Sequence, residues 1–324
     1  KMAKGGVMQM TTGQLQLTNS ITQIHAEGTI DSQYNFELTQ PAELRYTLSN
    51  AAFQSLSQLF HKEWPTLQEP TPIHLHIDPT EFNLRQFSLS NLYLQGVLEA
   101  KKLVIQDELG DFPVLENMML TWVLDSPRNN IYTNLKGVTY TKKDKKPSPI
   151  SAHMQFWLKP GEFKLAHTQS EIRMNFSGMP TSILNVLFDV PNLNPIIGPI
   201  LDVNIKAFYD PAQEKNGYLD LVIDSTNFHT EGRFIFNEYA QLYEGIKQPI
   251  FRLTITPESY QQIKKIFDLK NENALSTSFT VTGVLSKFNI PIQKNWTEKG
   301  IFDFKFSTTK IQWQDRQLLP WKLE

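Results

Sequence analysis

Alternation of apolar and polar residues is the main pattern along this chain. Leu44, Tyr46 and Leu48 are separated by polar residues, and a period of two is typical of a strand with one buried face. Connections between such runs are mostly too short for parallel crossovers, so we expect antiparallel meanders. The pattern predicts further strands over residues 7–17, 73–77, 84–90, 100–106, 118–124, 131–141, 152–158, 200–208, 217–223, 278–289 and 300–313.

A strand followed by a short helix is predicted three times. Residues 43–60, 171–188 and 250–267 align without gaps, and each changes midway from a period of two to apolar spacings of three and four, the stripe of an amphipathic helix. In the third segment, Thr256-Pro257-Glu258 supplies a capping hydroxyl, a proline at the first helical position and an acid in the first turn. The matching positions are the strand residues Arg45, Arg173 and Arg252, and the helix residues Leu56, Leu184 and Ile263.

A glycine motif surrounds these segments. Residues 24–30, 92–98 and 228–234 resemble one another, with a glycine inside an alternating run, and looser copies surround Gly137 and Gly283. A glycine within a strand usually marks a bulge or a bend. We therefore expect successive strands bent alike across one curved sheet.

The spacing of the repeats predicts one continuous array over residues 1–324. The interval between the first two segments is longer than the next, so we expect inserted hairpins within residues 108–165. No apolar run of about 18 residues occurs. A membrane anchor or signal is therefore expected only in segments outside this sequence.

Composition narrows the classes of function. Apolar residues make up 40% of the chain, enough for a sizeable core. The formal net charge of −2 gives no electrostatic footprint for nucleic acid, and the basic run at 142–146 reads as a solvated loop. Cysteine is absent, which excludes thiol catalysis, disulfides and thiolate metal sites.

One string has the appearance of a catalytic motif. His74-Leu75-His76-Ile77-Asp78 has the His-x-His-x-Asp spacing of metallo-hydrolases, but no further histidine follows it. An exposed polar strand face explains it more simply, so we expect no metal. The remaining histidines are scattered, and no nucleophile elbow, phosphate loop or His-Glu-x-x-His is present. We expect no enzyme activity and no cofactor. The scattered histidines are His25, His61, His153, His167 and His229.

The three repeated arginines have two interpretations. They could contact lipid headgroups or a partner, or they could lie on the outward face and pair across strands with acids such as Glu43. The second is favoured.

The alternating strands, glycine motifs and short helices, above all the blocks at 43–60, 171–188 and 250–267, resemble the repeat segments of AsmA-like and TamB-like bacterial envelope proteins. The resemblance implies a long curved antiparallel sheet forming an elongated groove with an apolar interior. It implies a place in the periplasm of a Gram-negative bacterium, with phospholipid or another lipid conducted between membranes. Envelope or outer-membrane proteins are the partners that it implies.

Two other classes stay open: an envelope repeat whose core is filled by its own side chains, and a closed β-cup for one small apolar ligand. In the lipid-conducting class that the resemblance implies, the inward strand faces would contact lipid. The residues chosen for that role are Leu92, Leu94, Val203, Ile205, Phe279 and Val281.

Overall fold

A computed structural model shows a mainly β protein with short helices, which confirms the predicted class. Within the described residues, no helix is both long and apolar enough to cross a membrane. The structure describes residues 11–19, 21–59, 66–83, 92–106, 112–143, 145–158, 168–184, 193–212, 217–236, 239–241, 248–266, 268–269, 274–291, 301–312, 317–318 and 322–323.

The chain divides into two compact units. Unit 1 comprises Lys1–Gln106, Val114–Val138 and Ser151–Ser170, and unit 2 comprises Asp107–Pro113, Thr139–Ile150 and Glu171–Glu324. The two units are taken separately below.

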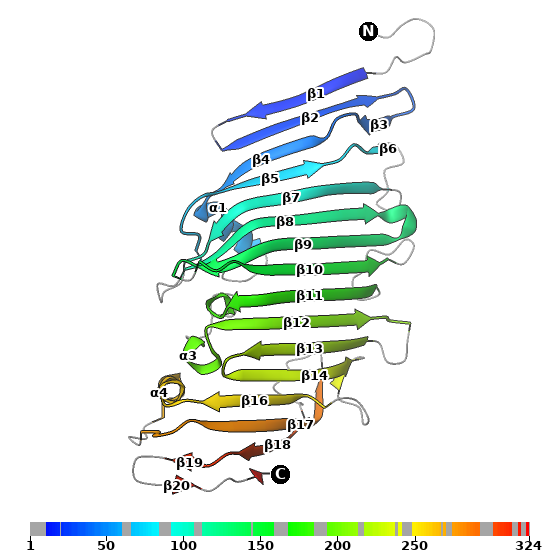
Figure 1. The fold of residues 1–324 in the computed structure, drawn as a ribbon. Coiled ribbons are helices and arrows are strands. Elements are labelled where there is room, and N and C mark those ends of the chain that lie inside the picture. The colour runs from blue at the N-terminus through cyan, green and yellow to red at the C-terminus, as the bar shows by residue number, and fades with distance from the viewer. Residues whose placement is uncertain are drawn as a thin grey trace, which may run out of the picture. The chain divides into compact units, whose positions relative to one another are not determined.

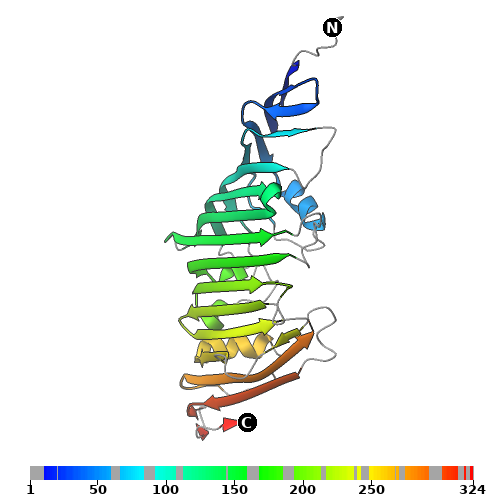
Figure 2. The ribbon, with the colours of Figure 1, turned by 90° about the vertical axis from the view of Figure 1, so that its right-hand side faces the viewer.

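Antiparallel neighbours in sequence form the sheet of unit 1. β1 (Thr11–Thr18), β2 (Thr22–Ile30), β4 (Ala42–Leu48), β5 (Thr71–Ile77), β7 (Tyr93–Val104) and β8 (Pro113–Asp125) pair in that order (Figure 1). The short strands β3 (Asn35–Leu38) and β6 (Glu81–Asn83) pair with each other, and β3 also pairs with β2. Figure 2 shows α1 (Asn50–Leu59) on one side of these strands.

Residues 108–165, where inserted hairpins are predicted, contain all of β8. They also contain β9 (Asn130–Thr141) and β10 (Ser148–Trp157), which pair with each other. A single 3₁₀ turn, η2 (Ser126–Arg128), separates β8 from β9. The predicted strand at 84–90 lies outside the described residues.

Unit 2 has the same kind of sheet. After β11 (Gln169–Pro180), the strands β12 (Ile200–Tyr209), β13 (Gly217–Ser225), β14 (Phe228–Phe236), β16 (Ile250–Ile255), β17 (Phe279–Pro291) and β18 (Ile301–Thr308) pair antiparallel in that order (Figure 1). The helices α3 (Asn194–Ile197) and α4 (Pro257–Ile266) contact each other beside the strand ends. Short strands complete it: β15 (Tyr239–Gln241), β19 (Ile311–Gln312), β20 (Gln317–Leu318) and β21 (Lys322–Leu323).

The described strand pairings leave the sheet open. A closed β-cup requires its first and last strands to pair, so the open sheet does not favour that alternative.

Two of the three predicted blocks change from strand to helix at the same aligned position. β4 leads into α1, and β16 leads into α4, where the Ser259 N–H donates to Thr256 Oγ1 at 3.1 Å. The second block differs, because β11 continues to Pro180 and helical residues begin at Ser182. The Asp202 carboxylate accepts the Gly178 N–H at 2.6 Å, which ties this end of β11 to β12 and delays the change. The helix of this block beyond residue 184 lies outside the described residues.

The motif glycines provide space and not bulges. Strand register continues without a shift across Gly28, Gly96 and Gly232, which excludes a bulge there, and the expected common bend stays a prediction. A Cβ at Gly96 would lie 2.3 Å from the His76 carbonyl oxygen and 2.9 Å from the Trp122 ring. The glycine therefore lets a large side chain of the next strand lie across its own strand.

Replacement of Gly96 tests this role. We expect Gly96→Ala to lower the free energy of unfolding by about 1–3 kcal/mol, because the backbone and Trp122 must both move. Gly13→Ala in β1 is the matched control, since no atom lies within 4 Å of the Cβ position. Equal losses in chemical denaturation would show that strand propensity, not space, is responsible.

Two adjacent residues of β12 test the core of unit 2. Leu201 is 0% exposed and Ile200 is 44% exposed. We expect Leu201→Ala to lower the free energy of unfolding, measured with denaturant, by about 2–5 kcal/mol, because a buried cavity is left. Ile200→Ala should lower it by well under half as much. Similar losses at both positions would contradict this placement of the core.

Candidate functional site

One face of the unit 1 sheet carries an unbroken row of aliphatic side chains. Residues directly opposite each other in an antiparallel pair share a face, so the register can be followed from strand to strand. Leu17 is 48% exposed, and the five residues after it in the row are half-buried. The apolar row therefore stays partly accessible across six strands. In strand order it is Leu17, Ile24, Leu44, Leu75, Leu98 and Leu120.

Unit 2 has a corresponding apolar face. Val203 lies opposite Ile223, which lies opposite Thr230, which lies opposite Phe251. Gly283 on β17 faces Phe251 and leaves space for its ring. A second row on the same face runs through Ile205, Leu221 and Gly232.

The six residues chosen from sequence as lipid-facing all lie at apolar-face positions of their strands, or directly before the strand in the case of Leu92. Their burial differs. Leu92 and Val203 are 6% and 8% exposed and already pack within the protein. Leu94, Ile205, Phe279 and Val281 are half-buried. These four are the better positions for contact with a bound molecule.

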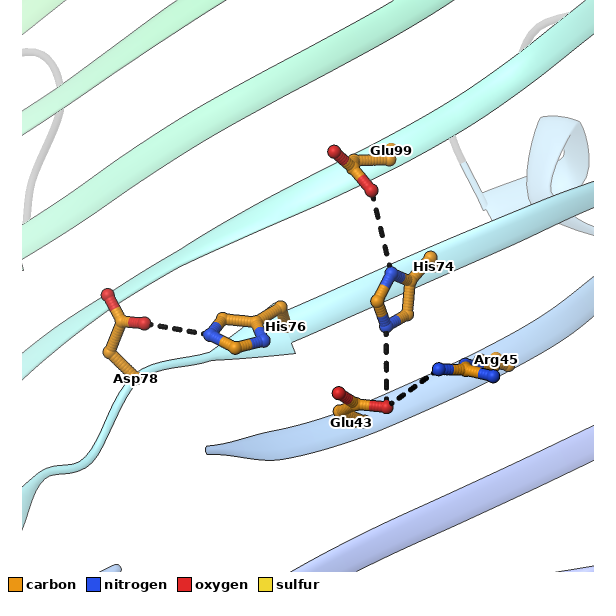
Figure 3. Close-up of polar contacts among 6 residues, drawn as sticks. All are labelled: Glu43, Arg45, His74, His76, Asp78 and Glu99. Atoms are coloured by element: carbon orange, nitrogen blue, oxygen red, sulfur yellow. Dashed lines mark hydrogen bonds and ion pairs between the residues drawn. The ribbon is translucent and has the colours of Figure 1, made fainter. Parts of the chain in front are cut away.

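The opposite face of unit 1 is polar. His74 lies between two carboxylates, with Nδ1 3.5 Å from Glu99 Oε2 and Nε2 3.7 Å from Glu43 Oε2 (Figure 3). Glu43 also pairs with Arg45 at 3.2 Å. Charged groups of β4, β5 and β7 thus meet around one imidazole on the polar face.

A pocket of about 410 Å³ opens on this polar side. Most of its lining residues are charged or polar, and Ile21, Pro72 and Ile73 add apolar surface. The charged groups of Arg45, Glu99 and Lys101 distinguish this pocket from the apolar face of the sheet. Its lining residues are Asn19, Ile21, Gln23, Arg45, Tyr46, Thr47, Pro72, Ile73, His74, Glu99 and Lys101.

The polar face of unit 2 carries its own ion pairs. Arg233 makes two hydrogen bonds to the Asp220 carboxylate on the next strand and lies over the Tyr218 ring, 4.8 Å from its centroid. The hydrogen bond to Asp220 raises the pKa of the Arg233 guanidinium. On the same face, His229 Nδ1 of β14 contacts Asp224 Oδ1 of β13.

The repeated arginines are exposed, as expected for the outward face. Their acidic partners include the expected Glu43, but the pairs lie along one strand, because Arg45 pairs with Glu43 and Arg173 with Glu171, two residues earlier. Arg252 lies opposite His229 and Thr282. The prediction of cross-strand acidic partners is therefore wrong for Arg45 and Arg173. Of the matched helix residues, Leu184 and Ile263 are half-buried, and the side chain of Leu56 lies outside the described part.

The histidine string lies on β5 with its histidines on the polar face. His76 Nε2 is 2.9 Å from Asp78 Oδ1, while His74 faces Glu43 and Glu99. Among the described residues, no group of three or more His, Asp or Glu side chains is arranged to hold a metal ion. Both histidine side chains are about one-third exposed.

The scattered histidines do not converge on this string where the structure describes them. His153 Nδ1 is 2.7 Å from Asn134 Oδ1, and His25 lies opposite Gln16 and Glu43. His61 and His167 lie outside the described residues.

Sequence reasoning missed the partners that the register brings together. Glu99 and Lys101 reach the same pocket as His74, although a single sequence contains no signal for the pairing of β5 with β7. Alternation along β7 places Gln95, Val97, Glu99 and Lys101 on one face, which is a local property of the sequence.

Comparisons with known proteins gave no relative. No family model, no curated protein and no solved structure matches this chain. The resemblance to AsmA-like and TamB-like proteins therefore stays a prediction.

The metal-free interpretation can be measured directly. We expect the purified protein to contain no stoichiometric zinc, and His74→Ala/His76→Ala to leave the metal content unchanged. Glu43→Gln/Glu99→Gln is the control, because it removes the carboxylates around His74 and keeps both imidazoles. If elemental analysis finds one equivalent of zinc, and the histidine variant loses it, the metallo-hydrolase interpretation of this motif is supported instead.

Proposed function

We propose that this chain is a non-enzymatic lipid-binding segment whose apolar sheet faces hold or conduct phospholipid, as the resemblance to AsmA-like and TamB-like proteins implies. The apolar row in unit 1 supports the proposal most strongly. Its members lie side by side on six successive strands, yet they keep part of their surface exposed.

Partial exposure of such a row has an energetic cost in water. Burial of apolar surface stabilises by about 25 cal/mol per Å², so an extended apolar face gains free energy when acyl chains cover it. A strand of five or six residues spans roughly 17–20 Å, which is comparable to an extended acyl chain. The polar opposite face stays in water.

A self-filled scaffold is the principal rival, and the burial of Leu92 and Val203 favours it locally. Both classes share the alternation of the strands. They differ in whether half-buried residues such as Leu94 and Val281 contact lipid or only protein.

The proposed location is the periplasm of a Gram-negative bacterium, with anchoring segments outside this sequence. Envelope or outer-membrane proteins are the proposed partners. The absence of a nucleic-acid footprint in the charge balance agrees with this assignment.

Charge substitutions at adjacent positions test lipid binding. Leu94→Asp and Val281→Glu place a carboxylate on the apolar faces, where desolvation beside a lipid tail costs on the order of several kcal/mol. Gln95→Asp and Thr282→Glu place the same charge one residue further on, on the polar faces. We expect the first pair to lose roughly tenfold or more of the lipid that co-purifies, measured by mass spectrometry, and the second pair to retain it.

Folding of each variant is followed in parallel by thermal unfolding. A conduit can hydrate the new carboxylate when it is empty, so the apolar-face variants should stay folded. If they unfold while the parent protein carries no lipid, the self-filled scaffold is correct. Photo-crosslinking from position 94 and position 281 gives an independent readout, in which lipid adducts support the conduit.

A further inference from the structure

The strand β1 has one unoccupied edge among the described strands. It pairs with β2 and with no other described strand (Figure 1). Its two faces continue those of the sheet, since Leu15 and Leu17 lie opposite Ala26 and Ile24 of the apolar face. Leu15 is 60% exposed and Leu17 is 48% exposed.

Nothing in β1 protects this edge from another strand. Natural edge strands usually carry charged residues, prolines or bulges that prevent pairing. The sequence of β1, Thr-Thr-Gly-Gln-Leu-Gln-Leu-Thr, has no charge and no proline, and its register with β2 is continuous. By contrast, β18 carries exposed Asp303 and Lys305, has a register shift against β17, and pairs with β21 at its end.

Gly13 gives a second and independent indication. Four other strand glycines each have a large side chain of a neighbouring strand within about 3 Å of their Cβ position, whereas no atom lies within 4 Å of that position at Gly13. The space beside Gly13 is of the kind that a side chain fills elsewhere in the sheet. The four glycines and their neighbours are Gly28 with Phe36, Gly96 with Trp122, Gly137 with Met118 and Gly283 with Phe251.

We propose that β1 pairs antiparallel with β1 of a second copy of this chain, in the register that places Leu15 opposite Leu15 of the partner subunit. This register puts Leu17 of the partner subunit opposite Gly13, so that its side chain fills the empty space. Gln14 then faces Gln16 of the partner subunit on the polar face. The apolar faces of the two copies become continuous.

The second copy is the occupant that the composition of β1 favours. An uncharged strand pairs with itself without like-charge repulsion, and both faces match because every opposed pair is apolar with apolar, or polar with polar. Two-fold pairing uses the free β1 edge of each copy. No free β1 edge is left for a third copy, so the assembly closes at two copies. The inference does not depend on lipid binding.

Cysteine cross-linking tests the register, because the chain has no cysteine of its own. We expect Leu15→Cys to form a disulfide-linked dimer under mild oxidation. Leu17→Cys is the matched control, since the two thiols would lie on strands offset by roughly 14 Å, beyond the Cα separation of about 7 Å that a disulfide allows. Equal or faster linkage through Leu17→Cys would overturn the proposal.

A charge pair tests the dimer without oxidation. Gln14→Lys/Gln16→Lys places like charges opposite each other twice across the interface and should weaken dimerisation roughly tenfold. Gln14→Lys/Gln16→Glu places opposite charges there and should restore it. Neither variant opposes the pairing of β1 with β2, where Gln14 faces Glu27 and Gln16 faces His25.

Sedimentation equilibrium up to about 100 µM provides the measurement, since one strand pair is below the usual size of a stable interface and predicts weak association. A concentration-dependent dimer with the expected order of the variants supports the proposal. A parent protein that stays monomeric over this range overturns it. A dimer whose dissociation constant is the same in both charge variants as in the parent also overturns it. Capture of an added strand peptide by a monomeric parent would assign the edge to another protein instead.

Discussion

The structure depends on antiparallel register combined with a side-chain period of two. Leu44 is apolar-facing because it alternates with Glu43 and Arg45, and the register then places it between Ile24 and Leu75. A slip of one residue in any strand would move its entire apolar set to the polar face. Every strand therefore has to agree with its neighbours, and this agreement produces two chemically different faces.

The two faces of the sheet have different kinds of side-chain contact. On the apolar face, glycines lie where the next strand carries a large side chain, as Gly96 does for Trp122 and Gly283 does for Phe251. On the polar face, charges are neutralised locally, within a strand for Arg45 and Glu43 or between strands for Arg233 and Asp220. Surface pairs of this kind add little stability, so most of it comes from the apolar face.

The partial exposure of the apolar face connects structure to the proposed function. A sheet covered by a second layer would bury such residues fully, whereas Leu44, Leu75 and Leu98 stay half-buried. The pocket around His74 lies on the other side, and its wall combines charged side chains with the apolar residues Ile21, Pro72 and Ile73. The pairing proposed at β1 would continue the same two-faced sheet into another chain.

The sequence by itself determined most of the longer strands, the residues that share a face within each of them, and the change from strand to helix at 43–60 and 250–267. These are local properties of a few successive residues. Only the tertiary structure decided the register: that Glu99 faces His74, that Trp122 covers Gly96, and that β11 continues past its aligned end because Asp202 holds Gly178. It also placed large side chains of neighbouring strands against Gly96 and Gly283, and it paired Arg45 and Arg173 with acids along their own strands and not across them. Such pairings join residues far apart in the chain, and their choice depends on how all the strands pack together, which no local pattern contains.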